Sequence, residues 1–213
     1  MTPDSPPNHN RLRRVRALLW VLVAAAVLGT AALLFMRRAP VDAPKAQGAA
    51  VQSSFGGPFT LVGADGKPFA STRLEGKPYA MYFGYTRCGD TCPTTLARIV
   101  KLRQAAGGPD ALNIVFVTID PANDGPKEVG QYATLFNAPI IGLTGSPAQI
   151  DAVKKQYGIF AQPEPSSDGH GMTMINHTAT VLLFDRGGKF AGTIAGDEAD
   201  GAAIAKLKRI IGA

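Results

Sequence analysis

A long uncharged segment stands apart near the start of the chain. Residues 17–36 contain no charged side chain, and Thr30 is the only clearly polar one. As a helix, this segment would span ~30 Å, the thickness of the hydrocarbon core of a bilayer. A cleaved secretory signal would have an apolar region of only about 7–15 residues, followed by a small-residue cleavage site. The pattern therefore predicts a single N-terminal transmembrane helix that is retained as an anchor.

Positive charge flanks this segment unequally. Four arginines precede it and two follow it: Arg11, Arg13, Arg14, Arg16, Arg37 and Arg38. Because the more positive end of a membrane helix stays in the cytoplasm, residues 1–16 are predicted to be a basic cytoplasmic N-terminus. Residues 37–54 contain few large apolar groups and predict a flexible linker. The folded domain is then expected at residues 55–213, on the far side of the membrane.

Within that domain, short apolar runs bounded by turn residues predict strands. Residues 58–71 are typical of a hairpin that turns at Asp65-Gly66. A second hairpin is predicted at 177–194, with Gly187-Gly188 at its turn. Nearly continuous apolar runs, which suit strands buried on both faces, occur at 77–85, 111–120 and 139–145.

Helical patterns alternate with these strands. Helices are predicted at 94–106, 125–137, 146–158 and 198–211. Ser146 and Pro147 suit the start of the third helix, and Gly158 suits its end. The alternation predicts an α/β fold, a mixed sheet flanked by helices. A cysteine loop that leads from an early buried strand into a helix is the thioredoxin-like arrangement.

Composition excludes several classes of protein. The hydrophobic fraction of 46% is too high for a disordered chain, and two cysteines are too few for a disulfide scaffold or a four-thiolate zinc site. The formal charge of +6 resides mostly in residues 1–38, which hold six arginines and one acid, whereas the other residues hold 16 basic and 15 acidic side chains. The body therefore lacks the basic excess of a nucleic-acid-binding domain.

The candidate chemistry centres on Cys88 and Cys92, which are four residues apart and lie at the predicted start of a helix. A helix N-terminus stabilises thiolates, so both sulfurs are expected to ionise readily. Three interpretations remain open at this point. The pair forms a structural disulfide, exchanges disulfides as a redox pair, or binds a soft metal ion, for which two thiolates and an imidazole suit copper.

A soft metal site of this kind needs a histidine, and the predicted domain has only His170 and His177. His177 begins the predicted late hairpin, where a sheet junction could lie beside the cysteine loop. Met172 and Met174 carry thioethers, which are also soft ligands, although packing of a loop is the simpler interpretation for both.

Two acidic residues follow a buried strand. Asp120 and Asp124 are expected at the carboxyl edge of the sheet, where ligands of α/β proteins bind. Ordinary turn chemistry, with Asp before Pro and then Asn-Asp-Gly, explains them equally well.

Four blocks together resemble the SCO/SenC family of membrane-tethered, thioredoxin-like copper proteins. They are GYTRCGDTCPTTL (84–96), TIDPANDGP (118–126), APIIGLTGSPAQI (138–150) and INHTATVLLFDRGGKFAG (175–192), and the likeness extends over residues 55–211. The family usually has Pro-Asp after its first cysteine, whereas this chain has Gly89-Asp90. Asp90 therefore fits the family pattern and Gly89 departs from it.

The resemblance implies copper, as Cu(I) or Cu(II), bound by Cys88, Cys92 and His177. Asp90, Asp120 and Asp124 would lie near the metal as supporting residues. Family members assist the copper centres of cytochrome c oxidase, so the implied partners are an oxidase subunit with a copper site and other copper chaperones or thiol reductants. The implied location is a bacterial-type inner membrane, with the C-terminal domain in the periplasm.

Three functional hypotheses follow. The first is a metallochaperone, which is not an enzyme, that metallates the oxidase. The alternative is a thiol-disulfide oxidoreductase in which Cys88 attacks and Cys92 resolves, acting on the cysteines of the oxidase copper site or on other exported partners. The third is a thiol peroxidase, in which Thr86 and Arg87 would activate Cys88.

Overall fold

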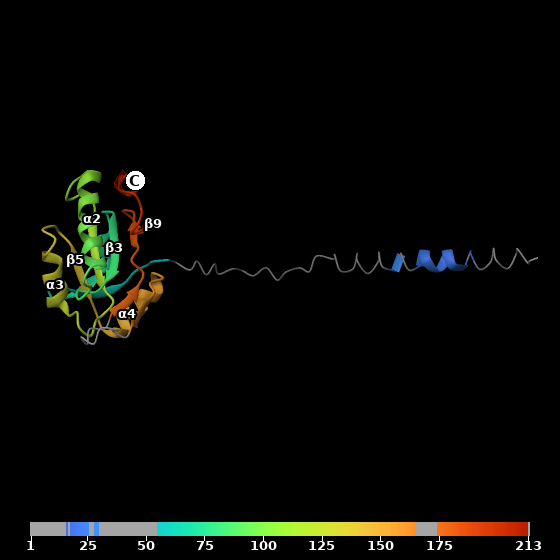
Figure 1. Ribbon diagram of the computed structural model, residues 1–213, viewed down its shortest axis with the longest axis horizontal. Helices are drawn as coiled ribbons and strands as arrows, with labels where there is room; N and C mark the ends of the chain where they lie inside the picture. Colours follow the sequence, from blue (N-terminus) through green and yellow to red (C-terminus); the bar gives the residue numbers. More distant parts are fainter. Residues whose placement is uncertain (1–15, 17, 26–27, 30–54, 165–173, 213) are drawn as a thin grey trace, which may run out of the picture. The chain divides into compact units, whose positions relative to one another are not determined.

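The computed structural model describes residues 16, 18–25, 28–29, 55–164 and 174–212 (Figure 1). The chain divides into two units, Met1–Val51 and Gln52–Ala213. In the first unit, residues 18–25 are helical and exposed. Within the described ranges no helix is both long and apolar enough to cross a bilayer. Half of the predicted anchor at 17–36 lies outside those ranges, as do the whole predicted linker at 37–54 and the residues His170 and Met172.

A seven-stranded mixed sheet forms the centre of the second unit (Figure 1). In spatial order its strands are β2 (Pro68–Ala70), β1 (Thr60–Gly63), β5 (Ile141–Thr144), β4 (Asn113–Thr118), β3 (Tyr79–Gly84), β8 (Val181–Phe184) and β9 (Phe190–Ile194). The three central strands β5, β4 and β3 are parallel, and the others pair antiparallel. The mixed α/β sheet predicted from the sequence is confirmed.

Among the described residues of this unit, one 3-10 turn and three helices connect strands, and a fourth helix follows the last strand. They are η1 (Ser71–Leu74), α2 (Thr91–Gly107), α3 (Pro126–Thr134), α4 (Pro147–Gln156) and α5 (Asp200–Gly212). Ser146 caps α4 as predicted, and it does so within a capping box, since its hydroxyl accepts from the backbone N–H of Gln149 and the Gln149 side chain accepts from the N–H of Ser146.

Adjacent residues of β3 show which helices cover each face of the sheet, because side chains alternate along a strand. Tyr82 lies beside Thr95 of α2. It is in register with Phe116, whose ring packs on Tyr132 of α3. Phe83 faces the other way and packs on Tyr157, which ends α4. Helices α2 and α3 therefore share one face, as right-handed crossovers require, and α4 covers the other.

The late hairpin differs from its prediction. The strand expected to begin at His177 begins at Val181. His177 instead ends β7 (Met174–His177), which pairs with β6 (Ala161–Glu164) in a separate two-stranded sheet. The reason is local pairing, because the N–H of Thr178 donates to the carbonyl of Phe160 and so continues the ladder with β6.

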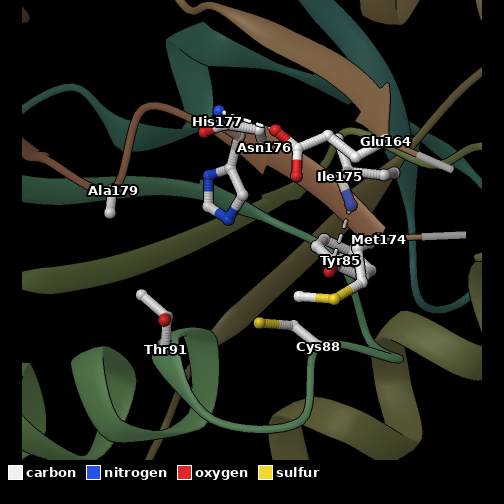
Figure 2. A pocket seen from close by; sticks show the side chains of 9 residues that line it. All are labelled: Tyr85, Cys88, Thr91, Glu164, Met174, Ile175, Asn176, His177 and Ala179. Carbon is white, nitrogen blue, oxygen red and sulfur yellow. Dashed lines mark hydrogen bonds between the residues drawn. The ribbon is translucent and has the colours of Figure 1, made fainter. Parts of the chain in front are cut away.

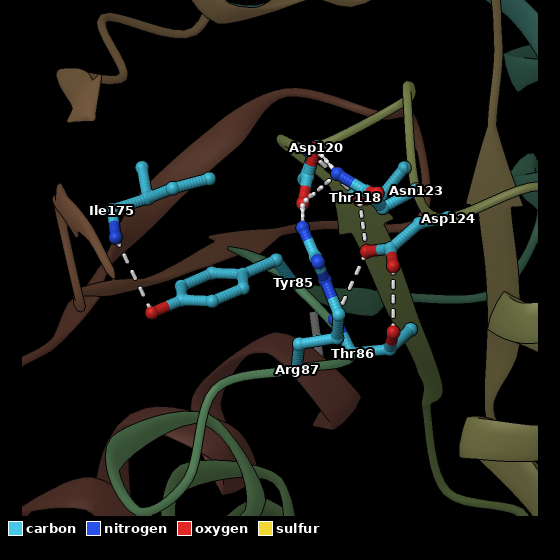
Figure 3. A network of polar contacts seen from close by, with 8 residues as sticks. All are labelled: Tyr85, Thr86, Arg87, Thr118, Asp120, Asn123, Asp124 and Ile175. Atoms are coloured by element: carbon cyan, nitrogen blue, oxygen red, sulfur yellow. Dashed lines mark hydrogen bonds and ion pairs between the residues drawn. The ribbon is translucent and has the colours of Figure 1, made fainter. Parts of the chain in front are cut away.

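Asp124 joins three segments at the carboxyl edge of the sheet (Figure 3). Its fully buried carboxylate accepts from the backbone N–H of Thr86 at 2.9 Å, from the Thr86 hydroxyl at 2.6 Å and from the Thr118 hydroxyl at 2.6 Å. Its carbonyl oxygen accepts from the Thr144 hydroxyl at 2.6 Å. These bonds fix the loop after β3 against the ends of β4 and β5.

Asp124→Ala should lower the stability of the domain by about 3 kcal/mol, because it leaves the Thr86 and Thr118 donors buried without their acceptor. At this chain length, that corresponds to a fall in Tm of roughly 6–12 °C, measured by calorimetry. The control is Asp120→Ala, which removes an ion pair between Asp120 and the more exposed Arg87 and should lower stability by less than about 1 kcal/mol. Equal losses in the two variants would contradict this role of Asp124.

Candidate metal centre

The two cysteines lie on either side of the start of α2. Cys88 is half-buried on the loop after β3, and Cys92 is fully buried in the first turn of the helix. Both thiols are free, and the backbone N–H of Cys92 donates to the Cys88 sulfur at 3.4 Å. The structure therefore contains a dithiol rather than the structural disulfide considered above.

Gly84, the last residue of β3, allows the Cys92 sulfur to approach the sheet. A Cβ atom at this position would lie 2.9 Å from Cys92 Sγ, 3.0 Å from Tyr82 Cε1 and 3.2 Å from Phe116 Cε2. The contact with the sulfur is shorter than real Cβ atoms make, so a larger residue would displace the thiol. The sequence interpretation missed Gly84, since nothing in an apolar run shows which residue must be small.

His177 approaches the buried thiol from β7, 85 positions further along the chain. Its Nε2 lies 3.5 Å from Cys92 Sγ, and its Nδ1 lies 3.0 Å from the carbonyl oxygen of Thr178. A proton on Nδ1 donated to that carbonyl leaves Nε2 with a free lone pair directed at the sulfur. With metal–ligand bonds near 2.3 Å for sulfur and 2.0–2.1 Å for nitrogen, as at zinc, this separation subtends roughly 105–110° at a shared ion.

A pocket of about 320 Å³ opens beside these groups (Figure 2). Cys88, Thr91, Met174 and His177 are among the residues that line it, and the Cys88 sulfur points into it from below in this view. Tyr85 forms part of its wall, where its hydroxyl accepts from the backbone N–H of Ile175 at 3.3 Å and so joins the cysteine loop to β7. Met174 is 60% exposed, so its thioether is not packed as a core side chain.

Burial controls the electrostatics of the centre. It raises the pKa of Cys92 to about 12, and a hydrogen bond with Cys88 adds to the rise. The prediction that the helix N-terminus makes both thiols acidic is therefore wrong for Cys92, because desolvation of the charged form outweighs the helix dipole. Burial also lowers the pKa of His177, which keeps the imidazole neutral at physiological pH.

The three acidic residues that the sequence singled out hold the segments on either side of Cys88, and none of them lines the pocket. Asp90 occupies the N-cap position of α2, where its carboxylate accepts from the Thr94 hydroxyl at 3.2 Å. Asp120 pairs with Arg87 at 2.7 Å, and Asp124 holds Thr86. Because Thr86 and Arg87 are engaged in this way, neither is available to activate Cys88 as a peroxidase would require (Figure 3).

The complete ligand set is not yet gathered around one point. Among the residues that the structure describes, no three His, Cys, Asp or Glu side chains form a group close enough to hold one ion. The contact between Cys92 and His177 is in place, whereas Cys88 would have to turn from its bond with the Cys92 N–H to join them.

Two solved structures have this arrangement of strands and helices. ScoI of Bradyrhizobium japonicum with copper bound is 36% identical, with a TM-score of 0.65 over 73% of this chain and 99% of that one. Arabidopsis thaliana ScoI with copper bound is 29% identical, with a TM-score of 0.66 over 74% of this chain and 98% of that one.

Similar sequences include the mitochondrial SCO1 homolog 1 of Arabidopsis thaliana, which is 34% identical over 62% of this chain and 40% of that protein. A SCO2-like protein of Rickettsia prowazekii is 34% identical over 63% of this chain and 66% of its own length. The chain spans about half the length of the curated relatives it matches. The family model for SCO1/SenC matches residues 47–212, and the chain therefore belongs to the SCO1/SenC family.

Proposed function

We propose that this domain is a copper metallochaperone that binds one copper ion through Cys88, Cys92 and His177. The observation that carries the proposal is the 3.5 Å approach of His177 Nε2 to Cys92 Sγ from a separate sheet. Two thiolates and a neutral imidazole form a soft donor set that favours Cu(I). Copper is bound in both ScoI structures that this chain resembles.

The two sulfurs differ in ways that suit transfer of the ion. Cys92 is enclosed by the sheet and α2, whereas Cys88 is half-buried and lines the open pocket. A partner thiol entering the pocket would reach the side of the ion next to Cys88 first. The ion would then pass by stepwise exchange, with Cys88 released before Cys92 and His177, so that it is never without ligands.

The partner and the location belong to the same proposal. The receiver would be the copper site of a cytochrome c oxidase subunit, as the family resemblance implies. Residues 17–36 would anchor the chain in the inner membrane, and residues 37–54 would let the domain at 55–213 reach its partner at a raised effective concentration.

The purified 213-residue chain should bind Cu(I) with a 1:1 stoichiometry when its thiols are reduced. His177→Ala should weaken the affinity by at least about 100-fold, since loss of a direct ligand exceeds the 10–100-fold effect of losing its outer partner. Cys88→Ser or Cys92→Ser should weaken it further, because an alcohol does not ionise at neutral pH. Competition with a chromophoric Cu(I) chelator measures each value.

Gln162→Ala provides the matched control for these variants. It truncates an exposed side chain on β6, opposite Asn176, and leaves the sulfurs and the imidazole untouched. Wild-type affinity in this variant would show that the hairpin tolerates truncation. Copper binding that survives the double Cys88→Ser, Cys92→Ser change would rule out the proposed site.

The affinity for Cu(I) should rise at least tenfold for each pH unit between pH 6 and 8. Copper binding displaces the thiol proton of Cys92, whose pKa of about 12 keeps it protonated throughout this range. His177 contributes little to the slope, because its lowered pKa leaves the ring already neutral. Competition titrations, corrected for protonation of the chelator, give the slope, and an affinity that does not change with pH would contradict the assignment of Cys92.

A thiol-disulfide oxidoreductase is the second candidate, favoured by the unequal exposure of the two free thiols. The Cys88 thiolate would attack a partner disulfide, forming a mixed disulfide and releasing one partner thiol. Cys92 would then attack the Cys88 sulfur, forming the Cys88–Cys92 disulfide and releasing the second partner thiol.

His177→Ala separates the two candidates. If disulfide reduction is an activity in its own right, this variant should reduce an oxidised dithiol peptide at close to the wild-type rate while its Cu(I) affinity falls. Stopped-flow measurement of peptide thiol release gives the rate. Parallel loss of both activities would instead show that the thiol chemistry depends on the imidazole.

A further inference from the structure

Tyr82 places a phenol hydroxyl in the interior directly behind the candidate metal centre. The residue lies on β3 and is fully buried. Among the described residues, its Oη has no hydrogen-bond partner of normal geometry. The polar side chains beside it are Cys92 and Thr95, both in the first turns of α2.

Several contacts place Tyr82, Cys92 and His177 in one cluster. Tyr82 Cε1 and Cys92 Sγ lie 3.0 Å and 2.9 Å from the same point, the position that a Cβ of Gly84 would occupy. The Tyr82 ring also packs edge-on against the imidazole of His177, with centroids 6.1 Å apart. The Tyr82 ring thus lies beside the Cys92 sulfur in the interior, where solvent reaches neither side chain.

Leaving this hydroxyl unpaired is unfavourable, since a buried polar group without a partner costs about 1–3 kcal/mol. A neutral thiol relieves the cost poorly, because its sulfur is a weak acceptor. A thiolate sulfur is a much stronger acceptor, and hydrogen bonds to charged groups contribute about 1.5–3 kcal/mol. The free dithiol therefore retains an unmet donor that the ionised, metal-bound sulfur would satisfy.

We infer that Tyr82 is a positioning residue whose O–H donates to the Cys92 sulfur when that sulfur carries negative charge in the copper complex. This inference rests on the proposed function and deepens it, because a buried side chain behind the ligands would then stabilise the copper-bound form of Cys92. Hydrogen bonds to a coordinating cysteine are known to tune the affinity and potential of soft metal sites.

The neighbouring tyrosines do not offer the same donor. Tyr85 has its hydroxyl engaged with the backbone N–H of Ile175. Tyr132 has a buried unpaired hydroxyl too, but within the described part of the chain it forms no hydrogen bond to either cysteine. Tyr82 remains protonated at any physiological pH, because burial raises its pKa above the usual value for a phenol.

The test compares Tyr82→Phe with Tyr157→Phe in the full chain. Each substitution removes one oxygen atom from a buried ring, but the Tyr157 hydroxyl donates to the carbonyl of Gly57 at 2.8 Å and packs on the opposite face of the sheet. Tyr82→Phe should leave the Tm of the metal-free protein unchanged or higher and weaken the Cu(I) affinity about tenfold at neutral pH. Tyr157→Phe should lower that Tm and leave the affinity unchanged.

A spectroscopic measurement separates donation to the sulfur from a change in packing. In the Cu(II)-loaded protein, loss of a hydrogen bond to the thiolate should move the sulfur-to-copper charge-transfer band to lower energy in Tyr82→Phe and leave it in place in Tyr157→Phe. A wild-type affinity and band in Tyr82→Phe would overturn the inference while the proposed function stands. Failure of the wild-type chain to bind copper would overturn the proposed function, and the inference with it.

Discussion

The Cys92 sulfur lies between the backbone of Gly84 and the imidazole of His177, and solvent does not reach it. In so nonpolar a setting an isolated thiolate is strongly disfavoured, which is why the pKa of Cys92 rises to about 12. A cation removes that penalty by neutralising the charge where it forms. The thiol proton does the same at neutral pH, so a soft ion would have to displace that proton to bind, and burial makes the binding depend on pH.

The fold supports this candidate centre from two segments, the cysteine loop and the strand that ends at His177. The loop before Cys88 is attached to the sheet through Thr86 and the buried carboxylate of Asp124. The strand that carries His177 is attached to the same loop through the Tyr85 hydroxyl. Neither attachment uses Cys88, Cys92 or His177, so the loop and the strand are held without an ion, and Cys88 is the side chain that would have to turn to complete the set.

Much of this arrangement could be predicted from the sequence, and the omissions have physical causes. The buried strands follow from apolar runs, and the helix after the cysteine loop follows from its helical pattern, although it begins at Thr91 and not at the predicted residue 94. The hairpin of β6 and β7 was missed because both strands are short and partly exposed, with Pro163 inside one of them. Tyr82 and Gly84 were missed because a continuous apolar run does not show which face its residues take. The sequence predicted an acidic Cys92 because it places the residue at a helix N-terminus. It does not show that the side chain is buried, and burial decides the pKa.

The contrast between Asp120 and Asp124 shows how one acidic turn can serve a binding site without supplying a ligand. The two carboxylates are four positions apart, yet one pairs with Arg87 near the surface and the other is buried beneath Thr86 and Thr118. Both act on the two residues that immediately precede Cys88. They hold the start of the loop, while Asp90 lies at the N-cap of the helix after it.

Only a few residues around Cys88 are left free to adjust. A centre with one rigid sulfur and one adjustable sulfur can hold an ion tightly and still open one coordination position to a partner.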